Sequence, residues 1–367
     1  MTKVHRSIRL FLLLYLASCS LDKNIHRQEE IPAQEFRFDE LFDPRLKLLD
    51  QKENVVLLLL PLSGSNSYIG MNVLNACLMD LNEAQNIDFY VVDTTDTSRE
   101  RYTIYNRLKN KNLKAIIGPV FSSETAQYGA LFPNTPILSF SNNLKINSGH
   151  VFACGLSLQD EIRALVAYAN AQQINSFLIM LPNGELGDQI VEIIGLEFKK
   201  YGMEEGDDLE IIRYTSITRK AATKYANNSN KKAVFIINPI LTISKLEDIQ
   251  VFTLSSAALS NIEVWDGVIF AFFDNQEQQE FVKKYRSVFG MQPTILDIMG
   301  YDLMKIVKES IISRSPIVQN YYQSCLGEFF LDKKSGLRRK LQIFRLENSR
   351  KIELTPSSEN SELSTDF

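Results

Sequence analysis

Short apolar runs alternate with segments of helical periodicity through the middle of the chain. Unbroken apolar runs of this length are typical of parallel strands that are covered on both faces. The first half of the chain has such runs at Val55–Leu60, Phe89–Val92, Ala115–Ile117 and Ile137–Phe140. Between them, apolar residues recur three or four positions apart, which predicts helices. One helix covers Arg99–Lys109, and another places on one face Ile69, Val73, Leu74, Cys77, Leu78 and Leu81.

The same alternation resumes after Cys154. It predicts further strands at Phe177–Met180, Glu210–Tyr214, Ala233–Ile237 and Gly267–Phe272. Helices are predicted at Ile190–Tyr201, Gln276–Phe289 and Tyr301–Ile312, and a closing β-hairpin at Leu341–Phe344 with Lys351–Leu354. Repeated βαβ units form open parallel sheets with helices on both faces. We therefore expect an α/β fold of two doubly wound lobes, with sheets of about four or five strands each.

The N-terminus has the form of an export signal. Lys3, Arg6 and Arg9 precede an apolar run, Leu10–Ala17, that is too short to span a bilayer. Leu16-Ala17-Ser18-Cys19 resembles a lipobox, the recognition site of bacterial lipoprotein processing. That resemblance implies cleavage after residue 18 and lipidation of Cys19, and several acyl chains on one residue give lasting membrane attachment.

The residues around the predicted body have the composition of a tether and a tail. Residues 19–53 are polar and charged, with Pro32 and Pro44, which predicts a lipid-anchored tether. Residues 355–367 are rich in Ser and Glu and are expected to be disordered. Ser20 follows Cys19 where lipoprotein sorting rules would place Asp for inner-membrane retention. We therefore expect an outer-membrane anchor facing the periplasm, with the lipid as the only contact to membrane.

The charge balance argues against nucleic acid as a partner. Removing residues 1–18 leaves 37 basic and 44 acidic side chains, a net charge of −7. Nucleic-acid-binding proteins need basic surface to displace counterions. After lipidation, Cys77, Cys154 and Cys325 remain. We expect three buried thiols, with one disulfide and a free thiol as the alternative.

Catalytic motifs are sparse. His150 is the only histidine beyond residue 53, so a Ser-His-Asp relay or a His-rich metal site would have to use that imidazole. The chain shows no carboxylate cluster, Gly-rich phosphate loop or CxxC pair. We therefore expect no enzyme, no catalytic residue, no metal site and no cofactor.

A series of short motifs, each weak alone, resembles a known family through its order and spacing. These motifs are Leu58-Leu-Leu60-Pro61-Leu-Ser63-Gly64, Asp93-Thr94, Ile117-Gly118-Pro119, Phe121-Ser122-Ser123-Glu124, Phe140-Ser141-Asn142, Leu181-Pro182, Tyr285, Phe289-Gly290 and Gly300-Tyr301-Asp302. Over about residues 54–350 the chain is similar to type I periplasmic binding proteins of the leucine-binding class. Within that class it most resembles the lipoproteins called penicillin-binding protein activators.

The resemblance implies two lobes joined by a three-stranded hinge. Lobe one would hold residues 54–154 and 272–330, and lobe two residues 155–271 and 331–354. Ligands of such sheets bind outside the carboxyl ends of parallel strands. The loops expected there are Ser63–Tyr68, Phe121–Thr125, Ser139–Asn143 and Pro182–Gly187.

Leucine-binding relatives hold an amino acid's carboxylate with groups that match Ser122, Ser139 and Ser141. The full set of candidate ligand-binding residues is Ser63, Tyr68, Ser122, Ser123, Ser139, Ser141, Tyr301 and Asp302. The alternative for the hydroxyls is that they cap helices and turns. The ligand's ammonium would need a carboxylate, for which Asp302 and Asp266 are candidates, although Asp302 could equally stand at a helix start.

Two functions remain open at this point. The resemblance to the activators implies a non-catalytic lipoprotein that regulates a peptidoglycan synthase, a penicillin-binding protein, by protein contact. The alternative is a receptor that closes on an amino acid or a similar small polar solute, for transport or sensing. The basic cluster Lys333-Lys334 with Arg338-Arg339-Lys340 is expected to be a solvated hairpin of lobe two, or else a patch for an acidic partner.

Overall fold

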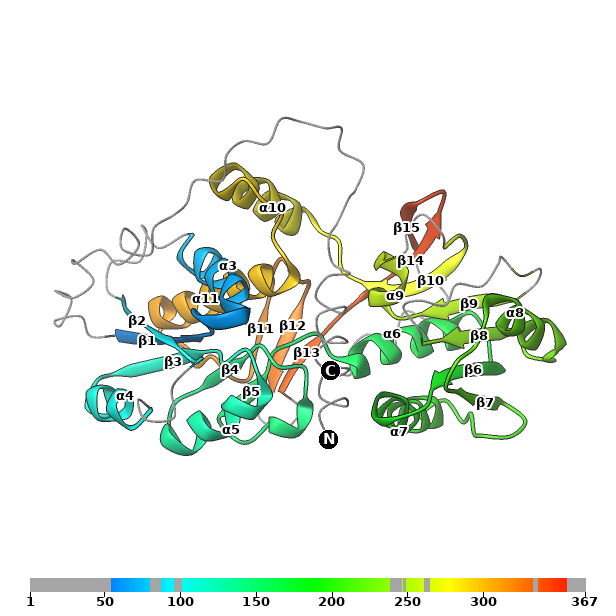
Figure 1. Ribbon diagram of the computed structural model, residues 1–367, viewed down its shortest axis with the longest axis horizontal. Helices are drawn as coiled ribbons and strands as arrows, with labels where there is room; N and C mark the ends of the chain where they lie inside the picture. Colours follow the sequence, from blue (N-terminus) through cyan, green and yellow to red (C-terminus); the bar gives the residue numbers. More distant parts are fainter. Residues whose placement is uncertain are drawn as a thin grey trace. The chain divides into compact units, whose positions relative to one another are not determined.

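The fold is described from a computed structural model, shown in Figure 1. The structure describes residues 54–79, 87–95, 101–237, 246, 249–260, 265–332 and 336–354. The predicted signal peptide, Cys19, the tether, the tail and the Lys333-Lys334 pair lie outside the described residues. The described chain forms two compact units and passes between them three times. The first unit holds the residues up to Ser157 and Asp274–Arg339, and the second holds Leu158–Phe273 and the residues from Lys340 onward.

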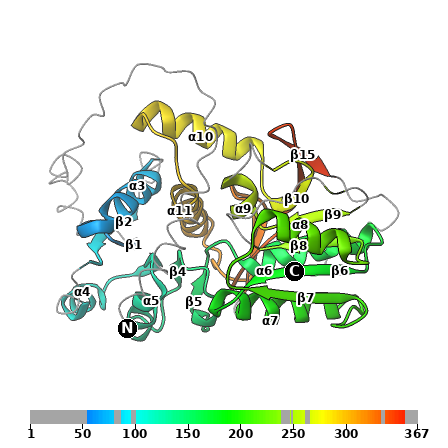
Figure 2. The ribbon, with the colours of Figure 1, turned by 45° about the vertical axis from the view of Figure 1, so that its right-hand side comes forward.

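The first unit is built on five parallel strands in the order β2-β1-β3-β4-β5. The strands are β1 (Asn54–Leu60), β2 (Ile87–Asp93), β3 (Leu113–Ile117), β4 (Ile137–Ser139) and β5 (Val151–Ala153). Its helices are α3 (Ser67–Leu78), α4 (Arg101–Leu108), α5 (Ser122–Leu131), α10 (Gln276–Phe289) and α11 (Ile295–Ser313). Figures 1 and 2 show α3 and α11 on one face of the sheet and α4 and α5 on the other. The sheet is therefore doubly wound, as the apolar runs predict.

The first unit also contains a small second sheet, called the third sheet below because the second unit has a sheet of its own. This sheet was not predicted. It is antiparallel and consists of β11 (Asn320–Tyr322), β12 (Phe329–Asp332) and β13 (Gly336–Arg339). The expected solvated hairpin is thus a real hairpin, β12–β13, but it belongs to the first unit and Arg339 is only 5% exposed. The last passage between the units lies between Arg339 and Lys340, whereas we expected it after residue 330.

The second unit is a seven-stranded sheet in the order β15-β14-β10-β9-β8-β6-β7. Its parallel part is β6 (Phe177–Pro182), β7 (Leu209–Tyr214), β8 (Ala233–Ile236), β9 (Gln250–Thr253) and β10 (Val268–Phe272). Its helices are α6 (Leu158–Ala171), α7 (Glu185–Lys199), α8 (Arg219–Asn228) and α9 (Ser255–Ser260). Read along the chain, the order β7-β6-β8-β9-β10 repeats the order of the first sheet.

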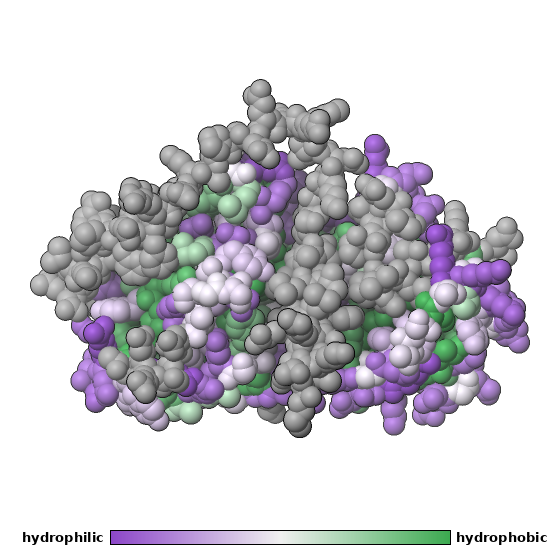
Figure 3. All heavy atoms as spheres, in the orientation of Figure 1, coloured by the Kyte–Doolittle hydropathy of each residue, from purple (hydrophilic) through white to green (hydrophobic). Residues whose placement is uncertain are grey.

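The predicted closing hairpin is confirmed. Strands β14 (Gln342–Glu347) and β15 (Arg350–Leu354) pair antiparallel, and β14 also pairs antiparallel with β10. β15 is the edge strand of its sheet and exposes Arg350 and Glu353. Its surroundings are hydrophilic in the space-filling view of Figure 3. Charged side chains on an edge strand discourage pairing with another chain.

Candidate functional site

The carboxyl edge of the five-stranded sheet gathers most of the predicted site residues. β1 lies between β2 and β3, so the chain turns to opposite sides after β1 and β3, and ligands of doubly wound sheets bind at such a switch point. Ser63 follows β1, Ser122 and Ser123 follow β3, and Ser139 and Ser141 stand at the end of β4. Tyr68 lies in the first turn of α3 and is 52% exposed.

The loop after β1 is fixed by the end of β2. Asp93 accepts hydrogen bonds from the backbone N–H groups of Leu62 at 2.8 Å and Thr95 at 3.0 Å. The Thr95 hydroxyl donates to the Ser63 carbonyl oxygen at 2.9 Å. Partial burial raises the pKa of Asp93, but the Ser63 hydroxyl and these N–H donors outweigh it and hold the pKa below its ordinary value. Asp93 is thus a stable anion at this edge.

Ser139 and Ser141 are engaged in the sheet's own turns. The buried Ser139 hydroxyl donates to the Pro119 carbonyl oxygen at 3.0 Å and lies 2.9 Å from the Thr125 hydroxyl. The Ser141 hydroxyl accepts from the Asn143 N–H at 3.0 Å. Pro119 follows the cis peptide bond after Gly118. These contacts match the structural role that the sequence left open as the alternative, and ligand binding by these two hydroxyls stays a hypothesis.

Glu124 also lies at this edge. It ends the motif Phe121-Ser122-Ser123-Glu124 but was not among the predicted site residues. It stands in the first turn of α5, and its Oε2 atom is buried without a hydrogen-bond partner among the described residues. Burial raises the pKa of Glu124 to about 7. The nearby Thr94 hydroxyl and the charge of Arg101 oppose the change, and the charge of Asp93 adds to it. Glu124 thus brings a second carboxyl group to this edge, beside Asp93.

Asp302 has a different environment. It is 1% exposed in the middle of α11, and its two oxygens accept from the N–H groups of Cys325 at 2.9 Å and Leu326 at 3.0 Å. Burial raises its pKa, and the charge of Arg339 opposes this. The alternative of a helix start is wrong, because α11 begins at Ile295. Tyr301 packs its ring on Phe281 at 4.6 Å between centroids. Asp266 belongs to the second unit and accepts from the Asn348 N–H at 3.2 Å.

The expectation of buried thiols is confirmed, since Cys77, Cys154 and Cys325 are free and buried. Burial raises the pKa of all three thiols, that of Cys154 to about 12, so none is an activated nucleophile. The His150 ring nitrogen Nε2 lies 3.1 Å from the Gly129 carbonyl oxygen. Within the part of the chain that the structure describes, no group of three His, Cys, Asp or Glu side chains could hold a metal ion.

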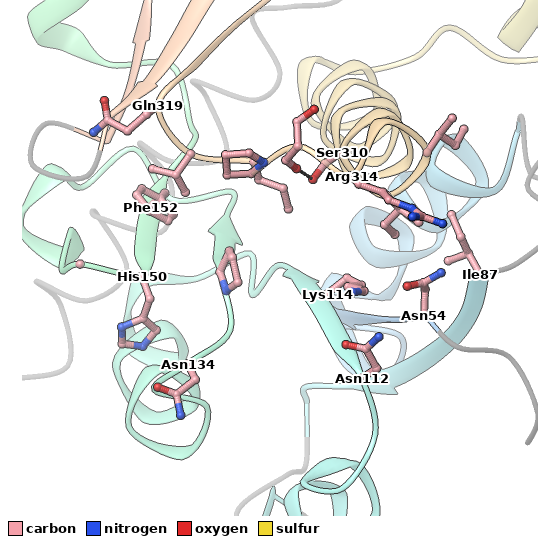
Figure 4. A pocket seen from close by; sticks show the side chains of 18 of the residues that line it. Asn54, Ile87, Asn112, Lys114, Asn134, His150, Phe152, Ser310, Arg314 and Gln319 are labelled. Carbon is pink, nitrogen blue, oxygen red and sulfur yellow. Dashed lines mark hydrogen bonds between the residues drawn. The ribbon is translucent and has the colours of Figure 1, made fainter.

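A cavity of about 1170 Å³ lies at the opposite edge of the same sheet (Figure 4). Its lining includes Asn54, Ile87 and His150, at the starts of β1, β2 and β5. Because parallel strands begin at one edge and end at the other, the cavity and the serine loops are separated by the length of the strands. The cavity is therefore not part of the switch-point site, which rests on topology and side-chain chemistry instead.

Comparison with known proteins assigns the chain to a family. The family "LppC putative lipoprotein" matches residues 24–224, more than half of the chain. A penicillin-binding protein activator, LpoA of Vibrio antiquarius, is 26% identical over 161 residues, which cover 41% of this chain and 26% of the activator. An uncharacterized protein of Rickettsia prowazekii is 25% identical over 193 residues, covering 51% of this chain and 46% of that protein. The chain thus spans about half or less of the length of these curated relatives.

Solved structures share the fold. The C-domain of LpoA from Haemophilus influenzae superposes with a TM-score of 0.64 at 16% identity, covering 82% of this chain and all of that domain. The leucine-binding protein LivK of Thermotoga maritima gives a TM-score of 0.53 at 16% identity, covering 82% of this chain and 97% of that one. In the described residues, no helix combines the length and the apolar character needed to cross a membrane. The chain has a type I periplasmic binding protein-like fold and belongs to the LppC lipoprotein family.

Proposed function

We propose that this chain is a non-catalytic lipoprotein of the outer membrane that regulates a peptidoglycan synthase by protein contact. Lipid on Cys19 anchors it, and the two-unit body faces the periplasm. The observation that carries the proposal is the family match together with the fold shared with the LpoA C-domain, a domain named as part of a regulator of PBP1A. The raised pKa values of the three described thiols also fit a non-catalytic role.

A reconstituted synthase tests the proposal. The full chain is added to a purified penicillin-binding protein from the same cells, and the rate of glycan polymerisation is measured with and without it. We expect a rate increase that saturates with chain concentration, together with crosslinking between the two proteins. A synthase whose rate is unchanged and that is not recovered by crosslinking would overturn the proposal.

The solute receptor stays the second candidate because of one observation, the carboxyl edge itself. Ser122, Ser123 and Glu124 follow one another in the first turn of α5, and Glu124 has a buried oxygen without a described partner. Hydroxyl donors beside a carboxylate are the two parts needed to bind an amino acid. Ser139 and Ser141 are poor probes of this idea. Their hydroxyls are hydrogen-bonded within the turns, so substitution would also disturb the turns.

A thermal-shift screen of amino acids and short peptides separates the two candidates. A ligand that binds only the folded chain at about 100 times its Kd adds roughly 2.7 kcal/mol to the unfolding free energy. We expect no saturable shift. A shift abolished by both Ser123→Ala and Glu124→Gln, and unchanged by Ser216→Ala at an exposed position between β7 and α8, would make the chain a receptor. Tryptophan emission is a weak readout, since Trp265 is only 2% exposed.

A further inference from the structure

The cavity at the amino edge of the five-stranded sheet is a surface that neither candidate function uses. Strand starts form one wall, with Asn54 at β1, Ile87 at β2, Lys114 near the start of β3, and Phe152 in β5. The other wall is the C-terminal end of α11 and the residues that lead to β11. All of these residues belong to the first unit. The cavity is thus built from one compact body.

The charge of the lining is one-sided. Among the described residues, the lining contains Lys114, Arg314 and His150, and no Asp or Glu. Neither Lys114 nor Arg314 forms an ion pair with a described residue. Figure 4 shows Lys114 and Arg314 on the same side of the cavity as the amides of Asn54 and Asn112. The chain as a whole has a net charge of −4, but the described lining has basic side chains without acidic partners, which favours anionic groups.

The α11 helix gives the strongest argument against an anion, because a helix C-terminus carries negative partial charge. Arg314 is the C-cap residue of α11, in a left-handed conformation with φ of 56°. Its guanidinium therefore stands at the helix end whose partial charge it offsets. Lys114 is on the sheet wall and is not needed for this compensation.

The remaining lining residues fit a polypeptide. Accessible apolar surface comes from Ile312 and Val318, with Pro133 and Pro316, while Asn112, Asn134 and Gln319 offer amides that can pair with a peptide backbone. Small-molecule pockets usually have volumes of about 300–1,000 Å³. At about 1170 Å³, this partly open cavity exceeds that range. Its size and mixed lining suit a stretch of chain better than a free metabolite.

We propose that this cavity binds an acidic peptide segment of a partner protein, with Lys114 and Arg314 pairing with its carboxylates and the apolar residues receiving its intervening side chains. The proposal rests on the charge, size and composition of the lining. It does not depend on the partner being a peptidoglycan synthase.

Fluorescence anisotropy tests the proposal with the full-length chain and a short fluorescein-labelled peptide of alternating glutamate and leucine. We expect the Lys114→Gln/Arg314→Gln double variant to raise the Kd about tenfold or more, equivalent to about 1.4 kcal/mol. Rising salt should weaken binding to the unchanged chain. The matched control is Lys283→Gln/Arg286→Gln, which removes one Lys and one Arg from exposed positions on α10 and should leave the Kd unchanged.

Four results would overturn the proposal: a Kd unchanged in the cavity variant, an equal loss in the α10 control, equal binding of a glutamine–leucine peptide, or equal competition by a glycan oligomer without peptide. Circular dichroism verifies that each variant is folded. Should the double variant not fold, Arg314→Gln alone decides the question, because Arg314 is exposed and its loss removes no core contact. This assay contains no synthase, so its outcome is separate from that of the polymerisation assay.

Discussion

Two carboxyl groups at the carboxyl edge of the first sheet have pKa values that are shifted in opposite directions. Asp93 receives several donors that keep its pKa low, whereas Glu124 is buried beside that negative charge and has a pKa of about 7. Near neutral pH the pair therefore carries between one and two negative charges. Any cation that reaches this edge meets a group whose charge responds to pH in the physiological range.

Glu124→Gln should flatten the pH dependence of stability between about pH 4.5 and 7. The pKa of Glu124 rises from 4.5 to about 7 on folding, so the folded state binds the proton more tightly. Its contribution to stability is present below pH 4.5 and is lost as pH rises through about 7. Asp297, whose pKa burial raises to about 7, acts with the same sign and will leave a residual slope.

Urea midpoints of the full chain at several pH values give the measurement. The matched control is Glu185→Gln, because Glu185 is also a first-turn glutamate, on α7, and is exposed. Its profile should follow that of the unchanged chain. A Glu124→Gln profile that is parallel to the control would show that Glu124 titrates normally.

At the level of single residues, the sequence predicted where hydroxyls gather but not what each contacts. The order of the motifs placed Ser63 and Ser122 after strands and Ser139 within the last residues of one, and topology brought all three to one edge. The roles of Glu124 and Asp302 depend on neighbours that are distant in sequence, namely Thr94 for the former and the Cys325–Leu326 turn for the latter. No local pattern carries that information.

At the scale of the elements, the same close contact occurs in both units, where the first strand leads into its helix. A Cβ atom on Gly70, in α3, would lie 2.1 Å from the Pro61 carbonyl oxygen, and one on Gly187, in α7, would lie 2.0 Å from that of Pro182. In both units the helix that follows the unit's first strand thus packs its first turns directly against the end of that strand. Glycine is required at both positions for this approach.

Gly70→Ala should lower the free energy of unfolding by about 1–3 kcal/mol, because the added methyl group meets backbone that cannot move freely. Gly195→Ala is the control. Gly195 lies in α7 with nothing within 4 Å of the added carbon, so alanine should stabilise the helix by about 0.5–1 kcal/mol. Equal effects in a chemical denaturation series would contradict the close contact at Gly70.

A buried cation joins three elements of the first unit. Arg339, in β13, donates to the carbonyl oxygens of Leu326 at 3.3 Å and Cys154 at 3.4 Å, and its guanidinium lies 5.1 Å from the Phe329 ring centre. Its charge also favours the ionised form of Asp302 on α11. The side chain thus connects α11, the end of β5 and the third sheet.

Arg339→Met should destabilise the chain by roughly 3 kcal/mol, since it leaves Asp302 buried with less compensation and removes two donors. Lys340→Met, at the exposed next residue, should change stability by less than about 0.5 kcal/mol. Urea unfolding followed by circular dichroism measures both. An Arg339→Met midpoint equal to that of Lys340→Met would mean that the buried contacts contribute nothing.

For the whole molecule, the doubly wound architecture was predictable and the third sheet was not. Apolar runs such as Val55–Leu60 are long enough to mark a strand, and they became β1 with a buried interior. β5 and β11 have three residues each, and β13 carries two arginines. Strands so short, or so charged, are formed by pairing with distant partners, which periodicity in one segment cannot reveal.

Cys19→Ala should abolish membrane attachment of the whole molecule, because both the acyl chains and the recognised cleavage site depend on that thiol. In a detergent partition we expect the variant either in the aqueous phase or still carrying its signal peptide. In both cases its intact mass should lack lipid. Cys77→Ala, which changes a buried thiol instead, should partition like the unchanged chain. Detergent-phase recovery of Cys19→Ala at the unchanged mass would refute lipidation at this residue.

The discontinuity of the first unit affects the order in which the chain folds during synthesis. The Cys77 thiol in α3 donates to the Gly300 carbonyl oxygen in α11, a contact spanning 223 residues, and Arg339 is needed still later. By contrast, the parallel strands β6–β10 of the second unit come from one uninterrupted stretch, Phe177–Phe272. Long loops close slowly. The contacts of α3 and β5 in the first unit can therefore be completed only after α11 and β13 have been synthesised.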